Sequence, residues 1–217
     1  MRRFRRLTGL VLCVTLLAVH GCRHDPPASS SSSSSSQVAL DQVLRDHHGI
    51  PPAAIERACA YLRQHPDKVT NPRYVTIIDF DQPSTARRMH VINMTTGKVE
   101  DLLVAHARKS GENYATQFSN TPGSNMSSLG VYLTGDAIVS PKHGPALLLH
   151  GQEPTNDNAL KREIILHGAD YVSDDFIQKN GRLGRSLGCP AVEDALAPRL
   201  VEELKGGSVM LIYKSEG

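Results

Sequence analysis

The 217-residue chain has a single long apolar run, at its N-terminus, which excludes a polytopic membrane protein. It also lacks a surplus of positive charge in its main part. Lysine and arginine number 24 against 22 acidic residues, but four of the basic residues lie within the first six positions. Without the first 21 residues, which contain no acid, 20 basic side chains face 22 acidic ones. We therefore expect no nucleic-acid-binding surface on the folded part.

Cysteine is scarce, and its positions do not indicate a disulfide framework. Cys13 lies in the apolar run, Cys22 at its end, Cys59 in a helical pattern and Cys189 in a glycine-rich loop. Four such different settings argue against two structural disulfides. Cys59 lies on the apolar stripe of its segment, so we expect it to pack in the core as a small hydrophobic residue.

The ten histidines lack the spacing of a metal site. Neither His-x-His nor His-Glu-x-x-His occurs, so we do not expect His106, His143 and His150 to bind zinc. Lining a cleft or making structural hydrogen bonds is the favoured interpretation of these three side chains.

Residues 1–21 have the pattern of a secretory signal peptide. Four arginines precede an apolar stretch over 7–19, which is short for a membrane span. The sequence Val19-His20-Gly21-Cys22 then resembles a bacterial lipobox, in which the cysteine is lipidated and becomes the mature N-terminus. We expect Cys22 to carry the lipid. Ordinary cleavage near Gly21, which leaves Cys22 as a free thiol, is the alternative.

Residues 22–37 are predicted to form a disordered tether. They contain an unbroken serine run over 29–36, which has no side chain to bury and cannot offset its ordering entropy. Such a tether lets an anchored domain search near a membrane. An unselected spacer is the alternative.

Residues 38–217 are expected to form one mainly β domain of the α+β class. Short apolar segments separated by turn residues predict strands over 74–80, 89–94, 99–105, 130–133, 146–150, 164–167 and 209–213. Residues 95–98 predict a hairpin turn. Helices are expected over 38–48, from residue 51 onward and over 192–204, where Pro198 must lie in the first turn or break the helix.

The segment 184–192 contains the clearest candidate for catalysis. Gly188 and Cys189 lie in a tight loop that can present a thiol and turn successive N–H groups outward as an oxyanion hole. A thiol nucleophile needs a base, and His167 at a predicted strand end is the best candidate. From these residues alone a structural loop cysteine remains the alternative, because ten histidines make a chance pairing easy.

His167-Gly168, a spacer of 17 residues and Ser186-Leu187-Gly188-Cys189 resemble the signature of the L,D-transpeptidase (YkuD-type) catalytic domain. The closer resemblance is to its murein L,D-transpeptidase branch. Further matching segments are 74–80, 104–106, 118–124, 127–130, 142–144, 156–159, 165–172 and 184–192, so the resemblance covers about residues 70–213. It implies a YkuD-like β-sandwich with N-terminal helices and a late C-terminal helix.

The resemblance also implies an activity, without a metal or organic cofactor. Such enzymes cleave the peptidoglycan stem tetrapeptide before its D-Ala at position four, form a thioester, and transfer the acyl group to an amine. Carried onto this chain, Cys189 is the nucleophile, His167 the general base and Ser186 a supporting residue. The backbone N–H groups of Leu187, Gly188 and Cys189 are the implied oxyanion hole. Carbapenem-type β-lactams are expected to acylate Cys189.

Two departures from the family pattern bear on substrate positioning. Leu187 stands where many members have His, and Pro190-Ala191 stand where many have a basic or polar residue. Arg185 and Arg182 are candidates to supply the missing positive charge for stem carboxylates; ordinary solvated loop charge is the alternative. The candidate substrate-binding residues are Arg185, Gly168 and His150.

The sequence is compatible with other functions as well. A hydrolase would trim a stem peptide or release a wall-linked lipoprotein, and a non-catalytic wall-binding lipoprotein would keep Cys189 for structure. A papain-like peptidase is disfavoured because His167 precedes Cys189. The expected protein is a monomer in the bacterial cell envelope, exported and lipid-anchored. Arg23 after Cys22, instead of Asp, favours the periplasmic face of an outer membrane where the cell has one.

Overall fold

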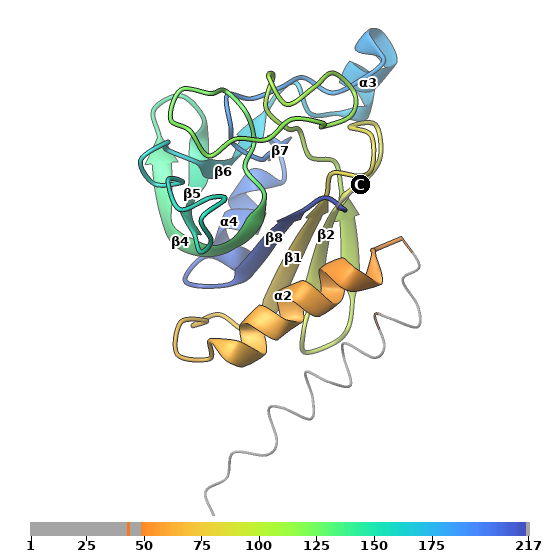
Figure 1. Ribbon diagram of the computed structural model, residues 1–217. Helices are drawn as coiled ribbons and strands as arrows, with labels where there is room; N and C mark the ends of the chain where they lie inside the picture. Colours follow the sequence, from red (N-terminus) through yellow and green to blue (C-terminus); the bar gives the residue numbers. More distant parts are fainter. Residues whose placement is uncertain (1–42, 44–48, 216–217) are drawn as a thin grey trace, which may run out of the picture.

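The computed structural model describes Val43 and residues 49–215 (Figure 1). The predicted signal peptide, the lipidation of Cys22 and the tether lie outside these residues, as does the helix expected over 38–48 apart from Val43. The described elements are α2 (Pro52–Gln64), β1 (Tyr74–Asp79), β2 (Met89–Asn93), β3 (Val99–Leu102), β4 (Gly130–Ser140), β5 (Gly144–Gly151), β6 (Ile165–Ala169), α3 (Asp174–Asn180), β7 (Ala191–Glu193), α4 (Ala197–Leu204) and β8 (Val209–Tyr213). None of the described helices is long and apolar enough to cross a membrane.

The eight strands form one sheet in the order β3-β2-β1-β8-β4-β5-β6-β7. Neighbouring strands are antiparallel, except that β1 pairs with β8 and β6 with β7 in parallel. A register shift between Thr134 and Ala137 marks a bulge in β4, and a bulge bends a strand. The sheet curves around α4, while α2 lies across the outer face of β1 and β8 (Figure 1). The mainly β, α+β architecture is confirmed. Strands β3-β2-β1-β8 form one half of the sheet and β4-β5-β6-β7 the other, and the two halves are joined by the pairing of β8 with β4.

Apolar side chains cover both faces of the central strands because alternate residues of a strand point to opposite faces. In β1, Ile77 packs in the cluster that contains α2, whereas Ile78 packs in the cluster that contains α4. Cys59 of α2 is 3% exposed and belongs to the first cluster, so its predicted core position is confirmed. The apolar face of α4 comprises Ala197, Leu200, Val201 and Leu204.

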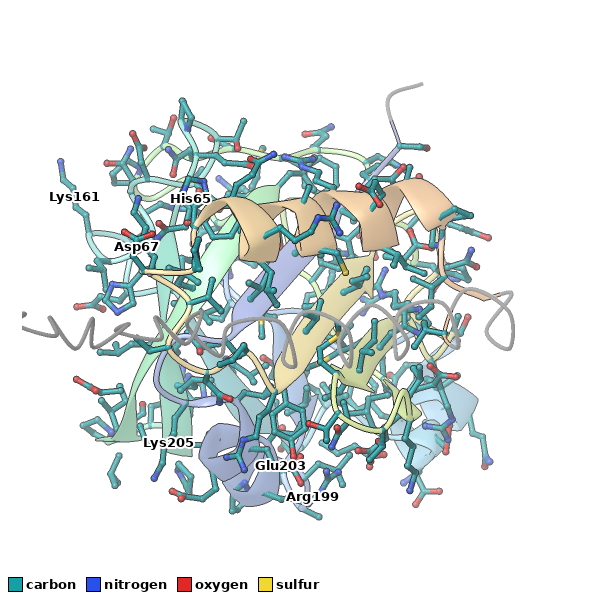
Figure 2. The ribbon with its side chains drawn as sticks, turned by 90° about the horizontal axis from the view of Figure 1, so that it is seen from below. His65, Asp67, Lys161, Arg199, Glu203 and Lys205 are labelled. Carbon is teal, nitrogen blue, oxygen red and sulfur yellow. The ribbon has the colours of Figure 1, made fainter. Side chains whose placement is uncertain are left out.

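Ion pairs at the protein surface also connect α4 to the sheet. Figure 2 shows Arg199 and Glu203 together on α4, and the guanidinium Nη1 lies 2.9 Å from a carboxylate oxygen of Glu203. Nη2 of Arg199 lies 2.7 Å from Glu100 of β3. These ion pairs are partly exposed, so they orient the helix and stabilise it by only about 0–1 kcal/mol each.

All seven predicted strands are present, and β8 has the bounds that the pattern predicted. The hairpin turn at 95–98 is confirmed: Gly97 has a φ of +72° and donates its N–H to the carbonyl of Asn93. The sequence analysis missed two elements, β7 and α3. The last helix was expected from residue 192 but starts at Ala197, because 191–193 pairs with β6 instead. Pro198 lies in its first turn, as expected.

Candidate functional site

The parallel pairing of β6 with β7 brings His167 and the Cys189 loop to one place. His167 lies in β6 opposite Ala191 of β7, and Cys189 precedes Ala191 by two residues. Both His167 and Cys189 line a cavity of about 920 Å³. The end of the β4–β5 hairpin, including His143, forms another part of its wall. The two residues singled out from the sequence therefore share one cavity.

His167 is held in a defined orientation by the residue that follows it. Its side chain is 1% exposed, and Nδ1 lies 2.7 Å from the carbonyl oxygen of Gly168. A carbonyl oxygen only accepts hydrogen bonds, so Nδ1 carries the hydrogen and Nε2 is left to accept a proton. Asp194 leaves no room for a side chain at position 168, because a Cβ there would lie 2.6 Å from an oxygen of the Asp194 carboxylate.

The His167 imidazole is tuned toward its neutral form. Burial lowers its pKa most, and the positive charges of His143 and Lys142 lower it further. The Gly168 carbonyl and Asp194 oppose this shift. The ring of His143 stacks on that of His167 and is itself shifted to a lower pKa by burial. A neutral imidazole is the form that can act as a general base.

Cys189 is half-buried, and its thiol faces the segment that enters β6. Sγ donates to the carbonyl oxygen of Glu163 at 3.7 Å. Burial raises the pKa of the thiol, while the Ile165 N–H and the charge of Arg162 lower it. Burial is the largest effect and favours the thiol form, so a nucleophilic role for this sulfur would require a base.

Ser186 stabilises the loop that carries Cys189 through two hydrogen bonds. Its hydroxyl donates to the carbonyl of Cys189 at 2.6 Å and accepts from the Gly188 N–H at 3.2 Å. Gly188 has a φ of +156°, and a Cβ there would lie 2.7 Å from Ile164 Cδ1. Of the three predicted oxyanion donors, Gly188 is thus already engaged. Within 49–215, the N–H groups of Leu187 and Cys189 donate to no oxygen of another residue.

Positive charge predominates on the cavity wall. Arg108, Lys142, Arg162 and Arg185 line it, against the single acid Glu163. The Arg185 guanidinium is engaged by Glu112 at 2.7 Å and by the Gly111 carbonyl at 3.0 Å. Arg182 also pairs with Glu112, at 3.1 Å, but it does not line the cavity.

The other predicted histidines lie apart from Cys189. His150 of β5 pairs with Leu133 of β4 and does not line the cavity. His106 is fully buried: Nδ1 accepts from Arg88 at 2.8 Å, and Nε2 donates to the Gly111 carbonyl at 3.2 Å. In the described part of the chain no three His, Cys, Asp or Glu side chains could together hold a metal ion.

Sequence reasoning missed Arg162 and the backbone of Glu163. Arg162 donates to the hydroxyls of Ser128 at 3.0 Å and Ser124 at 3.4 Å, and to the Met126 carbonyl. Glu163 has a φ of +55°, a conformation that a residue with a side chain rarely adopts. No motif marks either residue, because they precede β6 and approach Cys189, which precedes β7, only through the parallel pairing of β6 with β7. The signal for His143 was the matching segment 142–144.

A family model described as the L,D-transpeptidase catalytic domain matches residues 46–213. No curated protein matches the chain.

Among solved structures, an L,D-transpeptidase from Mycobacterium smegmatis is similar, with a TM-score of 0.42 and 11% identity, over 65% of this chain and 59% of that one. L,D-transpeptidase 3 from Mycobacterium tuberculosis has a TM-score of 0.40 and 11% identity, over 66% and 62%. An L,D-transpeptidase from Stackebrandtia nassauensis has a TM-score of 0.38 and 13% identity, over 89% and 96%. The chain spans 59% of the length of the first of these.

Proposed function

The chain belongs to the L,D-transpeptidase catalytic domain family, and on this premise we propose that it is a cysteine-dependent L,D-transpeptidase that modifies peptidoglycan. One observation carries the proposal. Cys189 and His167 line the same cavity, and the Gly168 carbonyl fixes His167 so that Nε2 can accept a proton. That arrangement suits acyl transfer, which needs a nucleophile and a proton shuttle.

In the first half of the proposed reaction, Cys189 passes its proton to Nε2 of His167. The sulfur attacks the carbonyl carbon before D-Ala at position four of the stem tetrapeptide. The tetrahedral intermediate carries a negative oxygen, for which the N–H groups of Leu187 and Cys189 are the available donors. His167 then protonates the departing amine, D-Ala leaves, and a thioester remains on Cys189.

In the second half, the amine of an acceptor stem attacks the thioester. His167 takes a proton from that amine, a new amide bond forms, and the thiolate of Cys189 leaves and recovers its proton. Water in place of the amine gives a shortened stem and a carboxypeptidase outcome. The choice between these outcomes depends on which nucleophile reaches the acyl-enzyme first.

Ser186 and Arg185 are given supporting roles in the proposal. Ser186 supports the loop that holds the sulfur through its bond to the Cys189 carbonyl. Arg185 is proposed to face stem carboxylates from the rim, although Glu112 competes for it. His150 is placed outside the cavity lining, so its position offers no support for a substrate-binding role. Gly168 is better explained as the residue that orients His167.

We also propose a location in the bacterial cell envelope, because that is where the proposed substrate lies. Export by residues 1–21 and a lipid on Cys22 are parts of the same proposal. A domain anchored through a serine-rich tether would reach stem peptides near the membrane.

The test is mass spectrometry of tetrapeptide muropeptides incubated with the full chain. Loss of D-Ala together with a cross-linked dimer is the expected result for the wild-type protein, and neither product should form with Cys189→Ala. Cys59→Ala is the matched control, because it removes a buried thiol from the other face of the sheet. D-Ala loss without a dimer would indicate a carboxypeptidase. Unchanged muropeptides with the wild-type protein would contradict the proposal.

A further inference from the structure

Arg162 is a cavity-lining cation that lies beside the loop that carries Cys189. Its Nη2 lies 3.4 Å from the position that a Cβ would take at Gly188, the residue before Cys189. Both Arg162 and Cys189 line the cavity. We propose that Arg162 stabilises the thiolate of Cys189 and so takes part in activating the nucleophile. This inference rests on the proposed function of Cys189.

The guanidinium is held in place by three acceptors on one side. These are the hydroxyls of Ser124 and Ser128 and the carbonyl of Met126. Three hydrogen bonds leave two of the five guanidinium N–H donors uncommitted among the described residues. An arginine fixed in this way is preorganised, so its charge acts on a nearby anion without the cost of ordering a long side chain.

The other titratable groups near this sulfur do not provide a positive charge that would stabilise a thiolate. Tyr132 of β4 and Tyr171 also interact with Cys189, and burial raises the pKa of each to about 12, so both stay neutral. Burial lowers the pKa of His143 and His167, which favours their uncharged forms. Glu163 is negative and opposes the thiolate. Arg162 alone among these groups keeps a positive charge at neutral pH.

Adjacent residues of one segment thus favour opposite protonation states of one sulfur. The Glu163 carbonyl accepts the S–H hydrogen and stabilises the thiol. When the proton moves from Sγ to Nε2 of His167, that hydrogen bond is lost. The charge of Arg162 and the Ile165 N–H then stabilise the sulfur anion. The residues that follow Cys189 in sequence, Pro190 and Ala191, carry no charge. Arg162, which is distant in sequence but lies beside Gly188, supplies a positive charge to the same loop.

The test measures how fast iodoacetamide alkylates Cys189 in the full chain, as a function of pH. Alkylation forms a carbon–sulfur bond and releases iodide, and only the thiolate reacts. Peptide mass spectrometry reads Cys189 separately from the other three cysteines. For Arg162→Gln we expect the midpoint of the profile to rise by about one pH unit, which is about a tenfold slower reaction at neutral pH.

Two variants separate charge from scaffolding. Arg162→Lys keeps the charge and loses the forked hydrogen bonds, so it should restore most of the rate. Arg108→Gln removes a cavity-lining charge that is not among the main influences on the pKa of Cys189, so its profile should stay close to that of the wild type. Thermal unfolding of each variant shows that it is folded.

An unchanged profile in folded Arg162→Gln would overturn the inference, and so would a lysine variant that reacts as slowly as the glutamine variant. Alkylation uses no peptidoglycan, so this result is independent of the muropeptide assay. A profile that depends on Arg162, in a chain that leaves muropeptides intact, would refute the proposed function and keep this inference. Muropeptide turnover with an unaffected profile would refute this inference alone.

Discussion

The imidazole ring of His143 stacks on that of His167, with ring centroids 3.8 Å apart and an interplanar angle of 28°. The two rings come from different elements: His143 from the turn between β4 and β5, and His167 from β6. The stack covers one face of the proposed base and places a second titratable ring beside it. Two imidazoles this close titrate as a coupled pair, because protonation of one disfavours protonation of the other.

Substitution His143→Gln should move the acid limb of the activity profile to higher pH. The variant exposes His167 and removes a neighbouring positive charge, and both changes raise the pKa of His167. The base is then protonated, and activity lost, at a pH that is higher by about half a unit to one unit. The pH dependence of D-Ala release would measure this. A limb that stays in place would show that His143 does not tune His167.

Removal of the Ser186 hydroxyl should slow catalysis more than it weakens folding. Ser186→Ala loses the bonds to the Cys189 carbonyl and the Gly188 N–H, so the sulfur is displaced. We expect a rate about a hundredfold lower and a loss of about 1 kcal/mol in the free energy of unfolding. Ser186→Thr keeps the hydroxyl and is the control in rate and urea-unfolding measurements. Equal rates for the alanine and threonine variants would contradict this role.

His106 should make the fold sensitive to acid. Burial and the charge of Arg88 lower its pKa from 6.5 to about 4. As the pH falls through this window, the unfolded chain binds a proton that the folded chain does not, so stability decreases with falling pH. The free energy of unfolding decreases by about 3 kcal/mol in total as the pH falls through this window, and none of this loss occurs above pH 6.5.

Urea unfolding at a series of pH values would test this prediction. His106→Gln should be less stable at neutral pH, because the buried ring that bonds both Arg88 and the Gly111 carbonyl is lost, yet its stability should vary less between pH 6.5 and pH 4. His143 and His167 would keep a smaller slope of the same sign, since their pKa values are lowered too. The same slope in variant and wild type would locate the sensitivity elsewhere.

A carbapenem-type β-lactam should acylate Cys189. Opening of the β-lactam ring by the thiolate resembles the first half of the proposed reaction and leaves a thioester on the sulfur. Intact-protein mass spectrometry should show one adduct, absent in Cys189→Ala and retained in Cys59→Ala. Arg162→Gln should form it more slowly. No adduct at any pH would count against Cys189 as a nucleophile.

Local pattern was sufficient for most elements of this fold. The short apolar run at 209–213 predicted β8, which is buried on both faces, and the apolar spacing around Cys59 predicted α2, which buries one face. The sequence also contained a readable signal for α3. Ser173 caps its N-terminus through Phe176, and Gly181 ends it in the left-handed region, but its short length and lack of buried residues hid it.

Pairing between distant segments decided what local pattern did not. Residues 191–193 lie next to a helix in sequence and have no strand pattern of their own, and they form β7 only because β6 offers its edge. The same pairing put His167 near Cys189, whereas His150, with an identical His-Gly pattern, lies outside the cavity lining. Periodicity cannot distinguish the two histidines, because it predicted a strand end for both; in the structure His167 lies in the middle of β6, which continues to Ala169.

The sequence by itself determined the family, the mainly β class, the core position of Cys59 and the two residues of the proposed catalytic pair. These depend on residue types at short or fixed spacings, where chemistry and backbone geometry leave few alternatives. Only the tertiary structure decided which groups surround that pair. Arg162, the Glu163 carbonyl and the ring of His143 act on Cys189 or His167 across strand pairings and a hairpin turn. Their influence depends on distance and burial in the folded chain, which no spacing along the sequence encodes.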